Sequence, residues 1–317
     1  MEHVSERTWV GVDVSKNYWD VAVQGEKRVR RFTADQAGCR RLMAMLIEQG
    51  LTHVCLEATG GWERPLVEAI YEQGLLVSVV NPRQVRDFAR AQGQLAKTDA
   101  IDARVIVQFA AMMQPAPHEK PSENQEKLRS LRARRRQVSD TLVQEKNRLA
   151  TGRDQVARRS IQEAIDFYQQ QLKTLDTQIG ELMQTDPEFQ QRLSLLVSVP
   201  GVGVTTAAAL MADLPELGTL NRREIARLAG LAPINRDSGM LRGRRMIGGG
   251  RSTVRKGLYM ATLVATKHNP VIREFYQQLI RRGKAKMTAL TACMRKLLLI
   301  LNAILKENKP WNFTQPA

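Results

Sequence analysis

The stretch Trp9-Val10-Gly11-Val12-Asp13-Val14 decides the fold of the first third of the chain. Its valine-rich and aromatic composition returns in Tyr18 to Val23 and in Arg28 to Thr33. Because only short polar turns separate the three runs, they are predicted to form an antiparallel meander of strands. Asp13 lies between two valines inside the first strand, where an acidic residue needs a reason to be present.

Helices and two further strands are predicted to alternate after the meander. A leucine and methionine stripe of helical spacing precedes a fourth strand, His53 to Glu57, and a helix around residues 67–71 precedes a fifth, Leu75 to Val80. Asp99 to Met113 is then predicted to be a helix that opens after Lys97-Thr98. The order βββαβαβα predicts a mixed sheet with helices, as in ribonuclease H-like folds.

Charge is distributed unevenly along the 317 residues, which carry 48 basic and 32 acidic side chains and a net charge of +16. Residues 1–120 and 121–189 are close to neutral, whereas residues 190–317 hold 21 Lys and Arg against six Asp and Glu. This segregation predicts three domains with these boundaries. It also predicts a polyanion-binding surface on the last domain, with nucleic acid as the partner.

Several classes of protein lack their usual signatures in this chain. It contains no Walker A, HExxH, paired CxxC or GxGxxG sequence, which disfavours nucleotide hydrolysis and zinc chemistry. Three cysteines without paired spacing, together with a charged start, favour a reduced, cytoplasmic protein. The uncharged stretch Leu193 to Ala212 has the length of a membrane span, but Pro200-Gly201-Val202-Gly203 interrupts it. We therefore expect two short helices there and no membrane.

Four carboxylates fall where the predicted topology would bring them together. Asp13 lies in the first strand, Glu57 ends the fourth, and Asp99 and Asp102 share one face of the last helix. Clustered carboxylates repel one another unless cations lie between them, and hard oxygen ligands suit Mg²⁺ or Mn²⁺. Two such ions can hold the attacking and leaving oxygens of a phosphodiester. Each acid taken alone is better explained as a surface residue or a helix cap.

The middle segment, 121–189, alternates in charge and carries a hydrophobic heptad pattern. The seam steps by four and three residues through Ile161, Ile165, Tyr168, Leu172, Leu175, Ile179 and Leu182. An earlier stretch from Leu128 to Leu149 keeps the phase, and Gly152 separates the two. We expect a coiled-coil segment, either a helical hairpin or two long helices that pair with a second copy. The alternative is that both helices pack only on their own domain.

The third segment opens with Val199-Pro200-Gly201-Val202-Gly203 between two apolar runs. Glycines at this spacing expose backbone N–H groups beside a helix N-terminus, which is the helix-hairpin-helix pattern for binding a DNA phosphate. The alternative is a turn in which Gly201 and Gly203 let small-residue helices pack closely.

From Ala232 to Arg255 the chain is rich in glycine and arginine and is predicted to be a polar loop. Its cations, with one lysine just beyond, are candidate phosphate ligands: Arg236, Arg242, Arg244, Arg245, Arg251, Arg255 and Lys256. Ser238 presents a hydroxyl among these cations, and Ser252 is its rival. A serine becomes a nucleophile only with the help of a base or metal, so each is more simply explained as a turn or cap residue.

Five motifs, in order along the chain, resemble the DEDD transposases of the IS110 family of bacterial insertion sequences, relatives of the Piv invertase. The motifs are Gly11-Val12-Asp13-Val14-Ser15-Lys16, Glu57-Ala58-Thr59-Gly60, Lys97-Thr98-Asp99-Ala100-Ile101-Asp102-Ala103, Val199-Pro200-Gly201-Val202-Gly203 and Arg236-Asp237-Ser238-Gly239. The resemblance implies a RuvC-like N-terminal domain, a coiled-coil linker and a mainly α C-terminal transposase domain. It further implies that the four acids bind magnesium and that Ser238 is the nucleophile.

Members of this family recombine a circular element into target DNA under the direction of an RNA that pairs with donor and target. They act as dimers that assemble into tetramers, so the resemblance implies donor and target DNA, a guide RNA and a homodimer as partners. A hydrolytic RuvC-like junction resolvase or a Piv-type DNA invertase would use the same acids, with water attacking in place of Ser238. An architectural nucleic-acid-binding protein would explain the charge of residues 190–317 but not Asp13.

Overall fold

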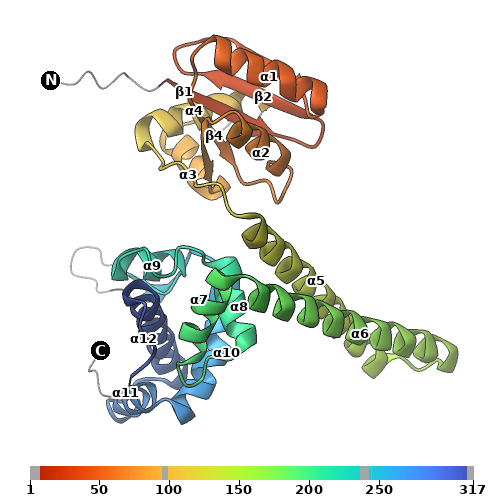
Figure 1. Cartoon of the computed structure of the whole chain (residues 1–317), viewed down its shortest axis with the longest axis vertical. Helices are drawn as coiled ribbons and strands as arrows, with labels where there is room; N and C mark the ends of the chain where they lie inside the picture. The colour runs from red at the N-terminus through yellow and green to blue at the C-terminus, as the bar shows by residue number, and fades with distance from the viewer. Residues whose placement is uncertain (1–7, 95–98, 236–242, 244, 313–317) are drawn as a thin grey trace. The chain divides into compact units, whose positions relative to one another are not determined.

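The protein is described by a computed structural model that covers residues 8–94, 99–235, 243 and 245–312, with the backbone alone at positions 99 and 100. The chain divides after Lys120 into two compact units, residues 1–120 and 121–317 (Figure 1). Each unit has its own hydrophobic core: the first unit packs apolar residues on both faces of a sheet, and the second packs helices on one another.

The first unit is built on a five-stranded mixed sheet of order β3-β2-β1-β4-β5. The strands β1 (Trp9–Val14), β2 (Tyr18–Val23) and β3 (Val29–Thr33) form the antiparallel meander. β4 (His53–Glu57) pairs in parallel with β1, and β5 (Leu76–Val80) pairs in parallel with β4. The mixed sheet and all five predicted strands are confirmed, with bounds within one residue of those predicted.

Helices cover both faces of this sheet (Figure 1). α1 (Gln36–Glu48) and α2 (Arg64–Glu72) pack on the face that carries Val12. α3 (Pro82–Ala91) and α4 (Asp99–Met113) pack on the opposite face. The alternation of side chains along each strand therefore supplies two separate cores, one on each side of the sheet.

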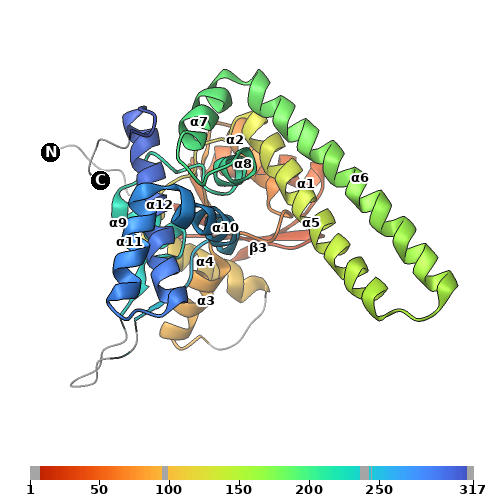
Figure 2. The ribbon, with the colours of Figure 1, turned by 90° about the horizontal axis from the view of Figure 1, so that it is seen from below.

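The second unit begins with an antiparallel helical hairpin, α5 (Glu123–Thr151) and α6 (Gln155–Thr185), seen clearly in Figure 2. The seam residues Ile165, Leu175 and Ile179 are buried in a single copy of the chain, so the seam packs within the chain. The hairpin is one of the two predicted arrangements. Ile161, Tyr168 and Leu172 of the seam are half-buried, and pairing with a second copy stays a prediction.

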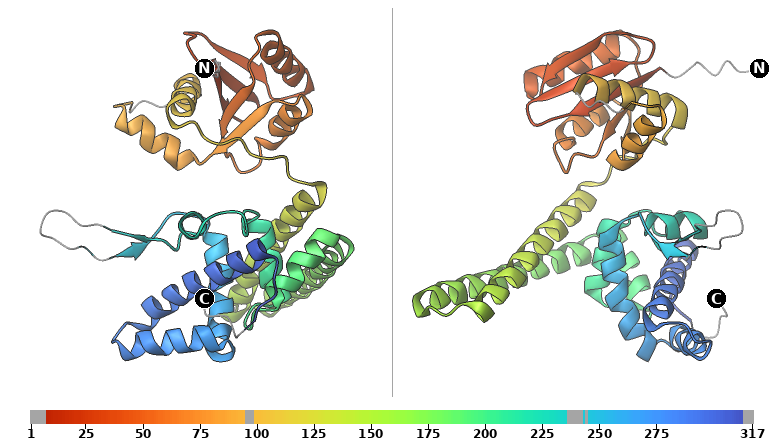
Figure 3. Two further views of the ribbon diagram at one scale, coloured as in Figure 1. Left: turned by 60° about the vertical axis from the view of Figure 1, so that its left-hand side comes forward. Right: turned by 180° about the vertical axis from the view of Figure 1, so that it is seen from behind.

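The helices α7 to α12 of the described residues form the helical body of the second unit (Figure 3). They are α7 (Pro187–Val197), α8 (Val204–Asp213), α9 (Arg222–Leu228), α10 (Ser252–His268), α11 (Pro270–Arg281) and α12 (Lys286–Glu307). The base of the α5–α6 hairpin shares their core through Leu128 and Leu182. Residues 121–189 are thus joined to residues 190–317 by a common core.

Two apolar segments of this body have the length or composition of membrane spans. The stretch Leu193 to Ala212 contains the C-terminal part of α7, a turn and most of α8, so the predicted break between two short helices is confirmed. α12 is 22 residues long, and its most apolar 18-residue window has a mean hydropathy of 1.6 and is 56% buried. Leu297, Leu298 and Leu301 of α12 belong to the core of the second unit, which accounts for the apolar composition of this helix.

Candidate active site

Asp13 and Glu57 occupy neighbouring positions at one edge of the sheet. β1 and β4 run parallel with Val12 opposite Leu56, and the two acids directly follow these paired residues. Adjacent strands lie about 4.8 Å apart, and residues at matching positions point to the same face. We call the ends of β1 and β4 that carry Asp13 and Glu57 the acid-bearing edge.

α4 packs on the sheet face to which both acids point. Gly11 precedes Asp13 by two residues and shares its face, and a Cβ at Gly11 would lie 2.6 Å from the carbonyl oxygen of Ala103 and 2.5 Å from the backbone nitrogen of Val107. Asp102, which is half-buried, immediately precedes Ala103. The absence of a side chain at Gly11 thus lets the helix that carries Asp102 approach the strand that carries Asp13.

The donor chemistry of these acids suits a divalent cation, because carboxylate oxygens are the ligands that Mg²⁺ prefers. Among the side chains that the structure describes, no three His, Cys, Asp or Glu residues form a group that could hold a metal ion. Asp99 is the first residue of α4, and its side chain lies outside the described set. Convergence of all four acids therefore stays a prediction, of which strand register supports the Asp13 and Glu57 part.

Asp20 extends the row of acids across the sheet, and the sequence pattern did not single it out. Asp20 lies opposite Asp13 on β2, and Arg31 lies opposite Asp20 on β3. Arg31 donates two hydrogen bonds to the Asp20 carboxylate, at 2.9 and 2.8 Å, and Asp20 is 5% exposed. An acid between Trp19 and Val21 is thus explained by an ion pair. Placement inside a strand does not by itself indicate a metal ligand.

One carboxylate fixes the loop that follows Glu57. Glu63 accepts hydrogen bonds from the backbone N–H groups of Thr59 at 3.0 Å and Gly61 at 2.8 Å, and from the Thr59 hydroxyl at 2.7 Å. Burial acts to raise the pKa of Glu63, but these hydrogen bonds outweigh it and hold the pKa below its usual value. The loop needs its glycines, since φ is +79° at Gly60 and +125° at Gly61.

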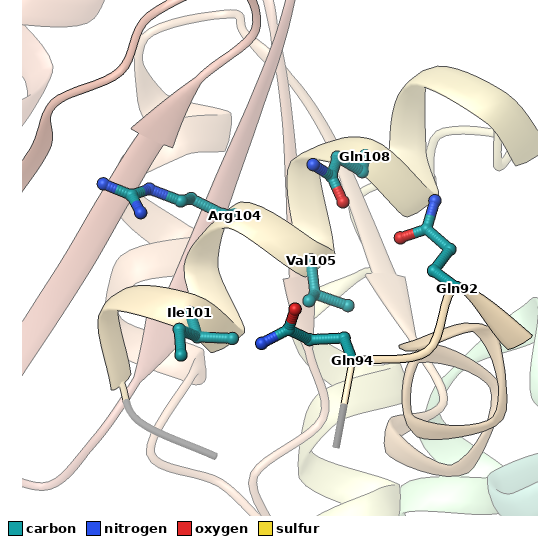
Figure 4. Close-up of a pocket in the computed structure, with 6 residues that line it drawn as sticks. All are labelled: Gln92, Gln94, Ile101, Arg104, Val105 and Gln108. Atoms are coloured by element: carbon teal, nitrogen blue, oxygen red, sulfur yellow. The ribbon is translucent and has the colours of Figure 1, made fainter. Parts of the chain in front are cut away.

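A pocket of about 750 Å³ lies beside α4 (Figure 4). Four of its residues come from α4 and two from the stretch that follows α3: Ile101, Arg104, Val105, Gln108, Gln92 and Gln94. None of these six side chains is acidic, so the predicted metal ligands that the structure describes do not line the pocket.

The predicted serine loop is carried by a small hairpin of the second unit, visible in Figure 3. β6 (Pro233–Ile234) pairs in antiparallel with β7 (Met246–Ile247), and the loop joins them. Four predicted site residues in this loop lie outside the described residues: Arg236, Ser238, Arg242 and Arg244. Their roles stay predictions.

A close backbone contact and an ion pair hold the base of this hairpin. Gly250 lies against Gly230 so closely that a Cβ on Gly250 would collide with the Gly230 backbone nitrogen. Arg251 donates to both carboxylate oxygens of Glu216, at 2.6 Å each, and to the carbonyl oxygen of Asp213 at 3.1 Å. Burial acts to raise the pKa of Glu216, but the hydrogen bond and charge of Arg251 outweigh it and lower the pKa.

Arg255 also makes contacts within the fold. Its guanidinium donates to the carbonyl oxygens of Ala229 at 3.3 Å and Gly249 at 2.5 Å. Arg251 and Arg255 therefore have structural partners that the sequence did not indicate, and phosphate binding by these two stays a prediction. Arg245 and Lys256 are exposed, as a phosphate ligand must be.

The predicted polar loop is too long at its C-terminal end. α10 begins at Ser252, because Val254, Leu258 and Ala261 form an apolar stripe of helical spacing that is buried in the core. Ser252, the rival nucleophile, is thus the first residue of a helix and is exposed.

The two glycines of the predicted phosphate-binding turn differ in their surroundings. Gly201 has φ +102°, and a Cβ there would lie 2.7 Å from the backbone nitrogen of Ala265 in α10. Close helix packing, the alternative considered for this turn, is confirmed for Gly201. Gly203 is the exposed N-cap of α8, and a Cβ there would have nothing within 4 Å. Phosphate binding at Gly203 stays a prediction.

Models of one protein family match both units. A DEDD IS110 model described as "Transposase" matches residues 10–156, and a model described as "Transposase IS116/IS110/IS902 family" matches residues 193–277. The chain belongs to the IS110 family of transposases. It is therefore an enzyme that recombines DNA, and the predicted family is confirmed.

Relatives of this transposase include proteins of similar length. Pilin gene-inverting proteins of Moraxella bovis and Moraxella lacunata are each 28% identical over 316 residues, which covers 96% of this chain and 98% of theirs. An uncharacterized 43.6 kDa protein of insertion element IS110 from Streptomyces coelicolor is 29% identical over 161 residues, 50% of this chain and 38% of its own length.

Proposed function

We propose that this transposase cuts and rejoins DNA at sites chosen by a guide RNA, through a phosphoserine–DNA intermediate formed at Ser238. The observation that carries the proposal is the neighbouring placement of Asp13 and Glu57 on parallel strands, in a chain whose two units match transposase models. Asp102 supports it, because α4 packs against the strand that carries Asp13.

Asp13, Glu57, Asp99 and Asp102 would hold Mg²⁺, or Mn²⁺ in its place. The metal would supply charge stabilisation at the oxygens of the scissile phosphodiester. Asp99 lies one turn before Asp102 on the same helix face. The first turn of α4 would therefore present two carboxylates to the acid-bearing edge.

Ser238 would carry the covalent step. Its Oγ forms a bond to phosphorus while the bond from phosphorus to the leaving DNA oxygen breaks, and the serine proton ends on that oxygen. A hydroxyl of the second strand then attacks the phosphoserine, joins that strand to the phosphate and releases Ser238. The phosphoserine ester conserves the energy of the broken phosphodiester, so rejoining needs no external energy source.

The cations near Ser238 would bind phosphates and offset the charge of the transition state. Arg236, Arg242 and Arg244 lie in the same loop, and the exposed Arg245 and Lys256 flank it. The excess of 21 basic over six acidic residues in 190–317 supports DNA and RNA as ligands of this part of the chain. A homodimer that assembles into a tetramer follows from the family resemblance.

DNA inversion is the second candidate activity. It is favoured by the two pilin gene-inverting relatives, which align over 98% of their length. A hydrolytic resolvase is the further alternative, in which water and not Ser238 attacks the phosphodiester.

The test is strand exchange by the full-length chain on a plasmid that carries the DNA flanking its own coding region, with the RNA transcribed from it. Asp13→Asn, Glu57→Gln and Ser238→Ala should abolish exchange and leave DNA binding intact. Glu68→Gln, an exposed acid on α2, is the matched control and should keep full activity. Exchange by Asp13→Asn would overturn the metal assignment. Cleavage without joining by Ser238→Ala would favour the hydrolytic alternative.

A further inference from the structure

Two large aromatic side chains are exposed among the described residues of the first unit, and both lie beside the acid-bearing edge. Trp62 is 54% exposed in the loop after β4, and Tyr18 is 44% exposed at the start of β2. Trp9 and Trp19 of the sheet are each 3% exposed. Exposure of aromatic rings is therefore concentrated next to the acids, and core packing does not explain it.

Each exposed ring has a cation close to it. The Lys16 Nζ lies 5.8 Å from the centroid of the Trp62 ring, and the Arg31 guanidinium lies 5.2 Å from the centroid of the Tyr18 ring. Lys16 is in the turn after β1 and Trp62 is in the loop after β4, so this contact joins the two loops that flank the acid-bearing edge. Aromatic rings combined with cations are how proteins bind single-stranded nucleic acid, by base stacking and phosphate contact.

Hydrogen bonds within the protein hold the loop that carries Trp62 without any ligand. Glu63 holds it through the hydrogen bonds from Thr59 and Gly61 described above. A ring on a fixed loop loses little conformational freedom when a base stacks on it. A surface cation–π contact alone would require neither this fixed loop nor a place beside the acids.

We infer that Trp62 and Lys16 form a strand-positioning site for one unpaired nucleotide of the DNA strand that is cut. The base stacks on the Trp62 ring, and Lys16 contacts the adjacent phosphate. This inference rests on the proposed function, because it assigns the acid-bearing edge to cleavage of that strand. Trp62 is a positioning residue: it fixes the phosphodiester relative to Asp13 and Glu57 and does not take part in bond making.

The direct test is the fluorescence of Trp62 in the full-length chain, titrated with a single-stranded oligodeoxynucleotide in EDTA so that no cleavage occurs. The difference between the wild-type and Trp62→Phe emission isolates the Trp62 signal from the other three tryptophans. A stacked base should quench that signal, and an oligonucleotide of the same length made only of abasic sites should not. The inference would be overturned if saturating DNA did not quench the Trp62 signal, or if an RNA oligonucleotide quenched it and the DNA oligonucleotide did not.

Affinity and activity give a second readout. Trp62→Leu keeps an apolar side chain but loses the π face, so binding of the single strand should weaken by about 5- to 150-fold, the range for one stacked base. Trp62→Phe should retain most of the affinity, and Lys16→Met should weaken it. Thermal unfolding of each variant should match wild type, because both side chains are exposed.

The two proposals can fail separately. Suppose that Asp13→Asn loses strand exchange, whereas Trp62→Leu binds the single strand and exchanges DNA like wild type. That result would overturn the strand-positioning site alone. Full exchange by Asp13→Asn would overturn the proposed metal site, and with it the assignment of the strand held by Trp62 as the one that is cut.

Discussion

The contact between Gly250 and Gly230 predicts a large difference between two alanine substitutions at adjacent positions. Gly249 and Gly250 have nearly the same left-handed backbone, with φ of +63° and +59°. An alanine at either position costs about 1–2 kcal/mol for that conformation. A Cβ on Gly249 has nothing within 4 Å, whereas a Cβ on Gly250 would lie 2.6 Å from the carbonyl oxygen of Leu228 and would collide with the backbone of Gly230.

The collision adds to the backbone cost because the contacted atoms are main chain and cannot rotate away. Overpacking of this kind costs about 1–3 kcal/mol, so Gly250→Ala should destabilise the second unit by roughly 2–5 kcal/mol in total. Gly249→Ala should cost roughly 1–2 kcal/mol. Against a total stability of about 5–15 kcal/mol, this difference is measurable by urea denaturation followed by circular dichroism.

Hydrogen exchange gives the local readout. The backbone N–H of Arg251 donates to the Leu228 carbonyl oxygen at 2.9 Å, at the base of the β6–β7 hairpin. This N–H should lose protection from exchange in Gly250→Ala and keep most of its protection in Gly249→Ala. Strand exchange should fall more in Gly250→Ala than in Gly249→Ala, since the base positions the loop that carries Ser238. Equal stabilities and equal protection in the two variants would refute the role of the glycine contact.

Four further predictions concern charge, assembly and the packing of the hairpin. DNA affinity of the full chain should fall by about 10³ to 10⁵ between 50 and 200 mM salt if its cations neutralise roughly 6–10 phosphates, and a flat dependence would contradict this picture. The Glu216–Arg251 pair should stabilise the fold above pH 4.5, the ordinary Glu pKa, and this stabilisation should be lost as pH falls through the lowered pKa of Glu216 in the folded state. The free energies of unfolding of wild type and Glu216→Gln, measured in urea, should therefore converge below pH 4.5. A difference between the two that does not change with pH would contradict this. Light scattering should show at least a dimer, whereas a monomer at working concentrations would contradict it. Leu175→Asp should reduce helicity and not merely separate copies, because its seam packs on the hairpin of the same chain.

The strands of the first unit could be predicted because each is a short β-rich run bounded by turn residues. α4 could be predicted with its bounds, since Asp99 opens an apolar stretch that ends at Met113. α3 could not, because it is ten residues long and mostly polar, although Asn81 followed by Pro82 is a helix-start signal that was present. Within the first unit, local pattern thus located the apolar strands and α4, and it missed α3, whose sequence is mostly polar.

The candidate site could be predicted only in part, because the contacts of its residues depend on strand register and packing. Asp13 and Asp20 look alike in sequence, each an acid inside an apolar strand, and only strand register shows that Asp20 faces Arg31. Arg251 and Arg255 look like phosphate ligands, yet Arg251 donates to Asp213, 38 residues away in sequence, and Arg255 donates to Ala229, 26 residues away, in addition to the nearby Gly249. Contacts over such separations depend on the packed fold and leave no local signature.

The proposed function requires that Ser238 becomes covalently joined to DNA and that this step depends on the four acids. The most direct measurement is to trap the reaction on a suicide DNA substrate, digest the protein and locate the nucleotide-bearing peptide by mass spectrometry. We expect an adduct on Ser238 that forms in wild type and is absent from Asp13→Asn and Ser238→Ala. An adduct on Ser252, or rejoined DNA from Ser238→Ala, would contradict it.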